Sequence, residues 1–134
     1  MLILADTSCW VEYLRPSGDG PTRDQMLAWL RADRLALCGA VRAEVLRGVR
    51  SGEAAGVDRA LSGLAYLPSV DEDWLTVTGT GRALAAAGVT VPLLDLLIAA
   101  LAVRVDALLA HRDAHFQAIA AHLPLRVHSF LPSR

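Results

Sequence analysis

Four carboxylate residues of this 134-residue chain have the chemistry of a divalent metal site: Asp6, Glu44, Asp95 and Asp113. Acids that converge on one place repel each other unless cations or protons neutralise them. Carboxylate oxygens are hard ligands that suit Mg²⁺ or Mn²⁺. One such ion activates water and a second stabilises a leaving oxygen, so no side-chain nucleophile is needed. If the four acids meet in space, they therefore predict hydrolysis of a phosphodiester.

Three of the four acids come shortly after predicted strands. Asp6 directly follows the apolar run at 2–5, and Asp113 comes soon after the apolar run at 107–110. Glu44 lies early in the helix that follows another short apolar segment. In a parallel α/β sheet the carboxyl ends of the strands share one edge, which is where ligands bind. We therefore expect these three side chains to approach one another.

The fourth acid, Asp95, opens a nearly continuous apolar helix that runs to Val103 and is preceded by Pro92. A helix that is apolar on all sides is buried on most of them. An acid at the start of such a helix cannot easily face solvent along its length. We therefore expect Asp95 to point into a cleft that it shares with the other acids.

Each acid taken alone also has an ordinary explanation. Asp6, Asp95 or Asp113 could simply cap the N-terminus of a helix. Glu44 could pair with Arg47, three residues later, on an exposed helix face. Because single capping acids are common, it is the combination of four acids at strand and helix ends that favours a shared metal site.

Short apolar runs alternate with helical patterns along the whole chain, which is typical of a parallel sheet covered on both faces. We predict one domain, residues 1–134, with a three-layer α/β/α architecture around a central parallel sheet of four to five short strands. The predicted strands are 2–5, 35–38, 107–110 and 125–128, and 66–70 is either a strand or, because of Pro68, an extended loop. The predicted helices are one capped by Thr7 or Ser8, then 22–32, 40–50, 53–65, 71–87, 95–103 and 113–122.

The bulk composition indicates a globular protein without a strong electrostatic field. Hydrophobic residues make up 54% of the chain and the net charge is −1, so any nucleic-acid contact needs a local patch. All 13 basic residues are arginine, whose planar fork grips phosphate. Cys9 and Cys38 form no disulfide or metal pattern, the N-terminus does not read as a signal peptide, and the apolar run 96–103 is too short to span a membrane. We therefore expect a soluble cytoplasmic protein.

Four short segments carry the four acids in order along the chain. They are Asp6–Ser8, Ala43–Gly48, Pro92–Ala100 and His111–Phe116. Each segment is weakly specific by itself. The ordered set, however, resembles the four motifs of PIN-domain ribonucleases and, more narrowly, those of the VapC toxins of bacterial toxin–antitoxin pairs. The resemblance extends over almost the entire chain.

The resemblance implies a PIN-like fold and an endoribonuclease that depends on Mg²⁺ or Mn²⁺. In this family four acids form the catalytic metal site, and a hydroxyl, here that of Ser8, supports it. The matching acids are Asp6, Glu44, Asp95 and Asp113. The resemblance further implies a homodimer, a cognate VapB-type antitoxin that inhibits the toxin, and cleavage of structured RNA such as tRNA or rRNA, which inhibits translation.

Several other residues near the acids allow more than one interpretation. Arg42, Arg47 and Arg112 could contact RNA phosphates, or they could lie on a solvated helix face. His111 stands where the family usually has threonine or serine, and we predict that it is a partly exposed turn residue. Glu12 is predicted to be an ordinary surface acid.

Two other functions use the same kind of fold. A non-catalytic PIN-fold binding module would keep the acids for structure or for partner binding, and it would hydrolyse nothing. A phosphorelay receiver domain shares the layered fold and an acidic metal pocket. The chain contains no lysine, although such receivers usually need one near the phosphoacceptor, and Asp6 has no acidic neighbour in sequence. These two observations argue against the receiver.

Overall fold

A five-stranded parallel sheet forms the centre of the computed structural model, which describes residues 1–132. Every strand pair is parallel, and the spatial order of the strands is β3-β2-β1-β4-β5. The strands are β1 (Ile3–Ala5), β2 (Leu35–Leu37), β3 (Ala65–Tyr66), β4 (Leu108–His111) and β5 (Val127–Ser129). The prediction of an α/β fold with a parallel sheet is therefore confirmed, and the uncertain segment at 66–70 contributes a two-residue strand followed by extended backbone.

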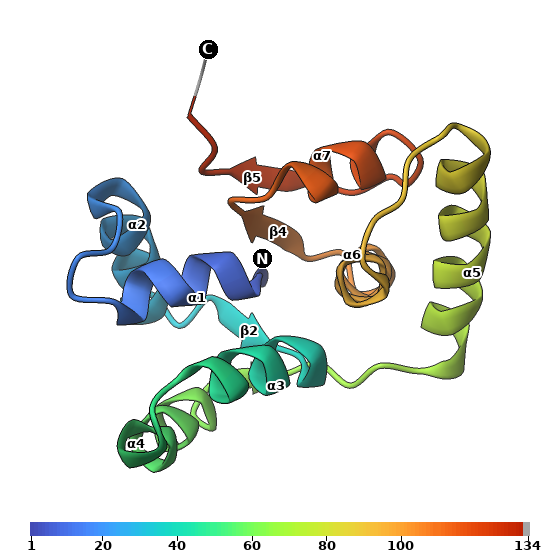
Figure 1. The fold of residues 1–134 in the computed structure, drawn as a ribbon. Helices are drawn as coiled ribbons and strands as arrows, with labels where there is room; N and C mark the ends of the chain where they lie inside the picture. The colour runs from blue at the N-terminus through green and yellow to red at the C-terminus, as the bar shows by residue number, and fades with distance from the viewer. Residues whose placement is uncertain (133–134) are drawn as a thin grey trace.

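Helices cover both faces of the sheet, with α1 to α4 on one side and α5 to α7 on the other (Figure 1). This division follows from the strand order and from the right-handedness of the crossovers. The connections from β1 to β2 and from β2 to β3 run in one direction across the sheet, and those from β3 to β4 and from β4 to β5 run in the opposite direction. Their helices therefore lie on opposite faces. The helices are α1 (Thr7–Leu14), α2 (Gly20–Arg31), α3 (Gly39–Gly48), α4 (Ser51–Leu61), α5 (Asp71–Ala86), α6 (Leu93–Arg104) and α7 (Ala114–Ala120).

The order of the strands reverses between β1 and β4, which lie side by side in the middle of the sheet. Ala5 is in register with Ala110, and the backbone N–H of Asp6 donates to the Ala110 carbonyl at 2.9 Å. A crevice opens beyond the carboxyl ends of the strands at such a reversal, and it is the usual ligand site of open α/β sheets. The fold therefore brings the residues after β1 close to those after β4, although about a hundred positions separate them in sequence.

The central strands and α6 form the core. All three residues of β1 are fully buried, and Leu96–Ala102 of α6 are buried without a break. An all-apolar stretch of helix has no wet face, which is why α6 runs through the interior. α6 begins at Leu93, so that Asp95 lies in its first turn and not at its start. None of the helices in residues 1–132 is both long enough and apolar enough to cross a membrane.

Helix α5 is attached to the body of the protein by an ion pair with α6. The Asp73 carboxylate is only 1% exposed and accepts from Arg104 Nε at 2.8 Å and from Arg104 Nη2 at 3.1 Å. It also accepts from the backbone N–H of Val70 at 3.0 Å, just before the helix begins. Arg104 Nη2 donates in addition to the Pro68 carbonyl at 2.8 Å. A single arginine thus connects the end of α6 with both the start of α5 and the segment that leads into it.

Candidate metal centre

Asp6 is the most deeply buried of the four acids. It ends β1 and is the N-cap of α1, where its Oδ1 accepts from the Cys9 backbone at 3.2 Å and from Ser8 Oγ at 2.6 Å. The N-cap is therefore Asp6, one of the capping acids considered above. It is not Thr7 or Ser8, which we had predicted to cap this helix. Asp6 is 4% exposed, and burial raises its pKa to about 6, although the two hydrogen bonds act in the opposite direction. Asp6 is thus both a helix cap and an ionisable group held at the reversal of the sheet.

Asp95 links the other acids to Asp6. Its charge also raises the pKa of Asp6. The pKa of Asp95 itself is raised, first by burial and then by the charges of Asp113 and Glu44, while a hydrogen bond from His115 lowers it. A carboxylate charge opposes the ionisation of a second carboxylate, and this effect is stronger where water is excluded. Asp95 is therefore electrostatically coupled to each of the other three acids.

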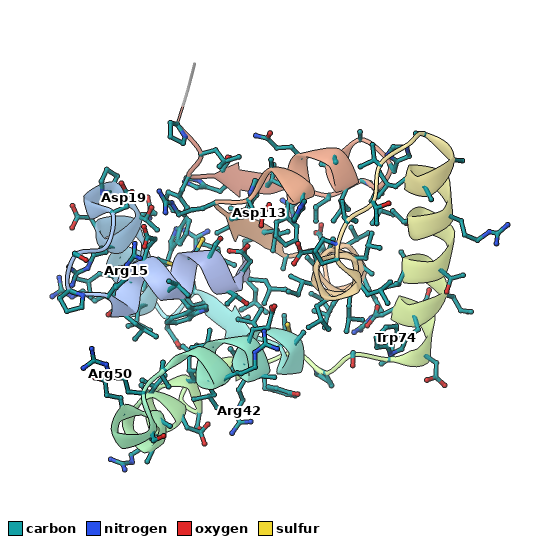
Figure 2. The ribbon with its side chains drawn as sticks, in the orientation of Figure 1. Arg15, Asp19, Arg42, Arg50, Trp74 and Asp113 are labelled. Atoms are coloured by element: carbon teal, nitrogen blue, oxygen red, sulfur yellow. The ribbon has the colours of Figure 1, made fainter. Side chains whose placement is uncertain are left out.

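Asp113 is held by the loop between β4 and α7. It is the N-cap of α7, and its Oδ1 accepts from the His115 backbone N–H at 2.9 Å. The backbone N–H of Asp113 donates to His111 Nδ1 at 3.2 Å. Figure 2 shows Asp113 at the start of α7, beyond the end of β4. Backbone and side-chain contacts thus fix the carboxylate on the edge of the sheet where Asp6 lies.

His111 is not a partly exposed turn residue, and that prediction is wrong. It is the last residue of β4, it is fully buried, and its ring packs on Phe116 with 5.3 Å between the centroids. Burial lowers the pKa of the imidazole, so that the ring is neutral and Nδ1 can accept the hydrogen bond from Asp113. The histidine therefore supports the loop that presents Asp113.

Glu44 projects from α3 and is oriented by α1. Thr7 Oγ1 donates to Glu44 Oε1 at 2.8 Å, whereas no ion pair joins Glu44 and Arg47 among residues 1–132. Ser8 plays a similar part between the two strand ends, because its Oγ donates to Asp6 and accepts from the Arg112 backbone N–H at 3.1 Å. The two hydroxyls after Asp6 therefore orient the site from opposite sides. From the sequence we identified Ser8 as a supporting residue but missed Thr7, although both lie in the Asp6–Ser8 motif.

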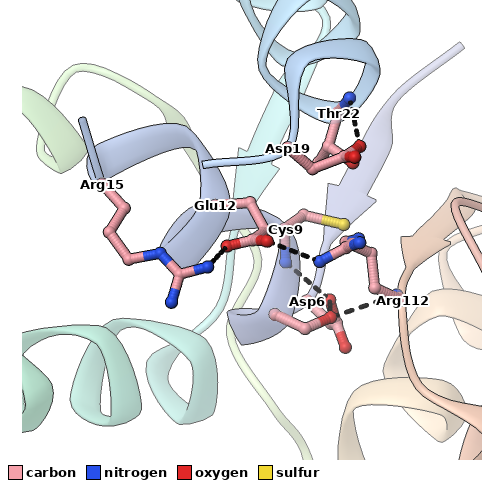
Figure 3. Close-up of polar contacts among 8 residues, drawn as sticks. Asp6, Cys9, Glu12, Arg15, Asp19, Thr22 and Arg112 are labelled. Carbon is pink, nitrogen blue, oxygen red and sulfur yellow. Dashed lines mark hydrogen bonds and ion pairs between the residues drawn. The ribbon is translucent and has the colours of Figure 1, made fainter. Parts of the chain in front are cut away.

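A buried glutamate next to the site holds two arginines (Figure 3). Glu12 is 7% exposed, so the prediction of an ordinary surface acid is wrong. Its Oε1 accepts from Arg112 at 2.7 Å and its Oε2 from Arg15. The burial of Glu12 is therefore compensated by two charged donors. The guanidinium of Arg112 lies against α1 in this arrangement.

The other two arginines that were candidates for RNA contact lie on α3. Arg42 pairs with Asp58 of α4 at 2.7 Å, on the outer side of α3 and away from Asp113 (Figure 2). Arg47 is exposed near the end of α3. Of the three candidates, Arg42 and Arg112 thus already have acidic partners.

A histidine that the sequence reasoning did not assign to the site completes the group. His115 Nδ1 lies 3.0 Å from Asp95 Oδ2 and 3.1 Å from Asp113 Oδ1. One ligand atom from each of these three residues lies within 4.8 Å of the other two. The only signal in the sequence was the position of His115, two residues after the last acid.

The residues at the sheet reversal fit a divalent cation. Asp6 is nearly inaccessible to solvent, yet it forms no ion pair within residues 1–132. Only its Oδ1 accepts hydrogen bonds from side chains or backbone of the described chain, so Oδ2 remains available. Several carboxylates that raise one another's pKa are stabilised by a cation between them. The donor set is thus rich in carboxylate oxygens, and within residues 1–132 His115 is the only basic side chain that pairs with any of the four acids.

This arrangement suits metal-assisted hydrolysis. A bound divalent ion would activate a water molecule and stabilise negative charge on the leaving oxygen. Asp6, Asp95 and Asp113 would hold the ion, and Glu44 would face it from α3. Cys9, the nearest thiol, is fully buried, and burial raises its pKa, so the thiol stays protonated. This thiol is therefore unsuited to act as the attacking nucleophile.

Comparison with known proteins agrees with the geometry. Residues 3–122 match the family described as the PIN domain. Ribonuclease VapC11 of Mycobacterium tuberculosis is 39% identical over 134 aligned residues, which cover 96% of this chain and 99% of that protein. The crystal structure of VapBC2 from Rickettsia felis, bound to a DNA fragment from its promoter, has a TM-score of 0.76 at 20% identity and covers 97% of this chain and 99% of the other.

A third relative is a solved structure whose target is named. Mycobacterium tuberculosis VapC20, described as a sarcin–ricin loop cleaving toxin, has a TM-score of 0.61 at 18% identity and covers 90% of this chain and 95% of its own. At these identities the two solved structures establish the fold alone. The family match includes all four acids, and the match to VapC11 runs nearly from end to end. The chain therefore belongs to the PIN-domain family and, within it, to the group of the VapC proteins.

Proposed function

We propose that the chain is a metal-dependent endoribonuclease, the toxin of a VapBC-type toxin–antitoxin pair, which hydrolyses RNA phosphodiesters and thereby inhibits translation. The main support is the environment of Asp6, a nearly inaccessible carboxylate whose pKa is raised by burial and by the charge of Asp95 and which has no ion-pair partner in residues 1–132. Such a group is costly to the fold unless a cation binds. In this proposal residues 1–134 act as a single nuclease domain in the cytoplasm.

The proposal gives each of the four acids a role at the metal ion, Mg²⁺ or Mn²⁺. Asp6, Asp95 and Asp113 bind the ion, and Glu44 completes the catalytic set. Ser8 and Thr7 orient the acids through hydrogen bonds and do not touch the ion. Arg47, which is exposed on α3, is suited to contact RNA phosphates. Arg42 and Arg112 would need to exchange their acidic partners for phosphate.

The names of the relatives support both the substrate and the partner. VapC11, the relative aligned nearly end to end, is called a ribonuclease. The neighbour from Rickettsia felis is a VapBC complex, which is a reason to expect a VapB-type antitoxin here. We also expect a homodimer.

A groove of about 350 Å³ between α1 and α3 is bordered by the exposed side chains of Val11 and Leu14 and reaches Glu44. Its apolar wall next to an acid of the site is suited to an antitoxin segment that blocks the centre.

The proposal is tested by incubating purified protein with total tRNA and with rRNA in Mg²⁺ or Mn²⁺, with and without a chelator. We expect discrete fragments that appear only with metal, since structured RNA is cut at few positions. An Asp95→Asn variant serves as the inactive control. Cleavage that persists in this variant, or in the presence of the chelator, would contradict the proposal.

The remaining alternative is a PIN-fold binding module without catalysis. It predicts weak metal affinity and no fragments from any RNA. Calorimetric titration with Mn²⁺ separates the two cases, because a nuclease centre binds the ion in the absence of RNA. The titration therefore identifies a binding module even if the correct RNA has not been found.

Addition of metal should raise the melting temperature of the protein. A ligand that binds only the folded state stabilises it by mass action, by about 3 kcal/mol at a hundredfold excess over Kd. The effect should be large because the ion also relieves repulsion among the acids. Differential scanning fluorimetry from zero to millimolar Mg²⁺ or Mn²⁺ measures the shift. An unchanged melting temperature at millimolar metal would argue against a shared metal pocket.

Replacement of Thr7 by valine should lower the rate of RNA cleavage by roughly tenfold or more. Groups that orient a metal-site carboxylate typically contribute ten- to hundredfold. Valine keeps the shape of threonine but removes the hydroxyl that donates to Glu44. Thr78→Val on α5 is the matched control, because its hydroxyl bonds only the Trp74 carbonyl within residues 1–132. Equal rates in the two variants would show that Thr7 does not orient Glu44.

A further inference from the structure

His115 is fixed between two of the proposed metal-binding carboxylates. It lies in the first turn of α7, and its Nδ1 is 3.0 Å from Asp95 Oδ2 and 3.1 Å from Asp113 Oδ1. Its backbone N–H donates to the same Asp113 oxygen at 2.9 Å. Among residues 1–132, no other basic side chain pairs with either carboxylate. The ring nitrogen therefore belongs to the same small group of atoms as the two acids.

These separations match those within the ligand shell of an ion. Neighbouring ligands of an octahedral ion with bonds of about 2.1 Å lie about 3 Å apart. The side chain of His115 is 43% exposed, so its other ring nitrogen, Nε2, can carry the proton and bond water. Binding of an ion at Nδ1 requires the tautomer with its proton on Nε2, and the ion then replaces the hydrogen bond between Nδ1 and Asp95. The ring thus has the position of a ligand and a second nitrogen that is able to carry the proton.

We propose that His115 is a nitrogen ligand of the metal ion and that it makes the centre select a first-row transition ion such as Mn²⁺ over Mg²⁺. This inference rests on the proposed function, because it assumes an ion at Asp95 and Asp113. Mg²⁺ is bound through oxygen and keeps several of its waters. Mn²⁺ also accepts oxygen ligands, but as a first-row transition ion it gains more than Mg²⁺ from an added imidazole nitrogen. A site with oxygen ligands alone would therefore show a weaker preference for Mn²⁺.

His122, which follows helix α7, provides a matched control. His122 follows the end of α7 and is exposed, and its only recorded contact within residues 1–132 is a 3.4 Å approach of Nδ1 to the Ala118 carbonyl. His122→Ala therefore removes an imidazole near α7 without touching the acids. His115→Ala removes the proposed ligand, and His115→Gln removes it while it keeps a polar side chain. Melting temperatures in a chelator establish that all three variants fold.

The experiment is pulsed electron paramagnetic resonance of Mn²⁺ bound to the protein, together with calorimetric affinities for Mn²⁺ and Mg²⁺. We expect nitrogen-14 coupling from one imidazole in the wild type and in His122→Ala, and none in either His115 variant. The Kd for Mn²⁺ should rise by roughly ten- to hundredfold in the His115 variants. The Kd for Mg²⁺ should change by less than about threefold, since Mg²⁺ does not depend on this ligand.

Three contrary outcomes can be distinguished. If Mn²⁺ binds the wild type without nitrogen coupling, or if the His115 variants keep its affinity, then His115 is not a ligand, and the proposed nuclease centre of four acids still stands. If neither ion binds the wild type, the metal-dependent function fails as well, and His115 has no ion to select. Equal losses of affinity for Mn²⁺ and Mg²⁺ would overturn the selectivity and leave only ligation.

Discussion

Replacement of Asp6 by asparagine is expected to abolish RNA cleavage and, in the same protein, to raise the stability of the metal-free fold at neutral pH. A metal-bound carboxylate contributes several kcal/mol to the transition state, so the rate should fall by roughly a thousandfold. Asparagine keeps an oxygen that can accept from Ser8 Oγ and from the Cys9 backbone, as Asp6 Oδ1 does now. The helix cap therefore survives while the charge is removed.

The stability effect follows from the direction of the pKa change. The pKa of Asp6 is about 6 in the folded protein, and its ordinary value, which applies to the unfolded chain, is 3.8. Between these two pH values the folded state therefore binds more protons than the unfolded state. Stability then falls as the pH rises from about 4 to about 6. Above that window the ionised group costs about 3 kcal/mol. The asparagine side chain carries no charge and avoids this cost.

Urea unfolding in a chelator, at pH 5 and at pH 7.5, measures the effect together with a cleavage assay. The variant should be more stable than the wild type at pH 7.5, and the gap should narrow at pH 5. Asp24→Asn, at an exposed acid on α2, is the control and should change neither property. A variant that is less stable than the wild type at pH 7.5 would show that ionised Asp6 does not burden the fold. A variant that cleaves RNA normally would remove Asp6 from the metal site.

Replacement of Arg104 by alanine is expected to destabilise the protein by about 3 kcal/mol and to loosen α5. The change leaves the carboxylate of Asp73 buried without its charged donor, and breaking a buried pair from one side typically costs a few kcal/mol. It also removes the hydrogen bond to the Pro68 carbonyl. Helix α5 packs mainly on α6, so the loss should be greatest there.

Urea unfolding measures the total loss of stability. Hydrogen exchange of the α5 amides shows whether this loss is concentrated in α5. Arg82→Ala, at an exposed arginine of α5, is the matched control and should stay within about 0.5 kcal/mol of the wild type. Adding Asp73→Asn to Arg104→Ala should restore part of the loss, because it removes the uncompensated charge and keeps an acceptor for Val70. If the double variant is no more stable than Arg104→Ala, the cost does not come from the buried charge.

The sequence was informative where local patterns determine the outcome. Apolar runs that end at an acid or a turn predicted four of the strands to within two residues at each end, because a strand buried on both faces consists mostly of apolar residues. Asp6 and Asp95 could be assigned to the site for a related reason, since a strand end and a buried helix restrict where an acid can point.

The errors concern residues whose environment is made by distant parts of the chain. Glu12 reads as a surface acid in its own helix, and only the approach of Arg112 from the end of β4 makes its burial possible. His111 was expected in a turn, but β4 extends one residue further and is covered by Phe116. His115 became relevant only when α7 brought it against Asp95. Such long-range contacts leave no periodic signal in the sequence.

The pairing of β1 with β4 also determines when the crevice can form during synthesis of the chain. The N-terminal strand is synthesised first, yet its neighbour on one side is completed only at His111, and Asp113 follows two residues later. A nascent chain that is still being elongated lacks this half of the crevice and one of its four acids. The crevice can therefore assemble only after the chain has been synthesised past Asp113, and a product that ends before this residue lacks one of the four acids.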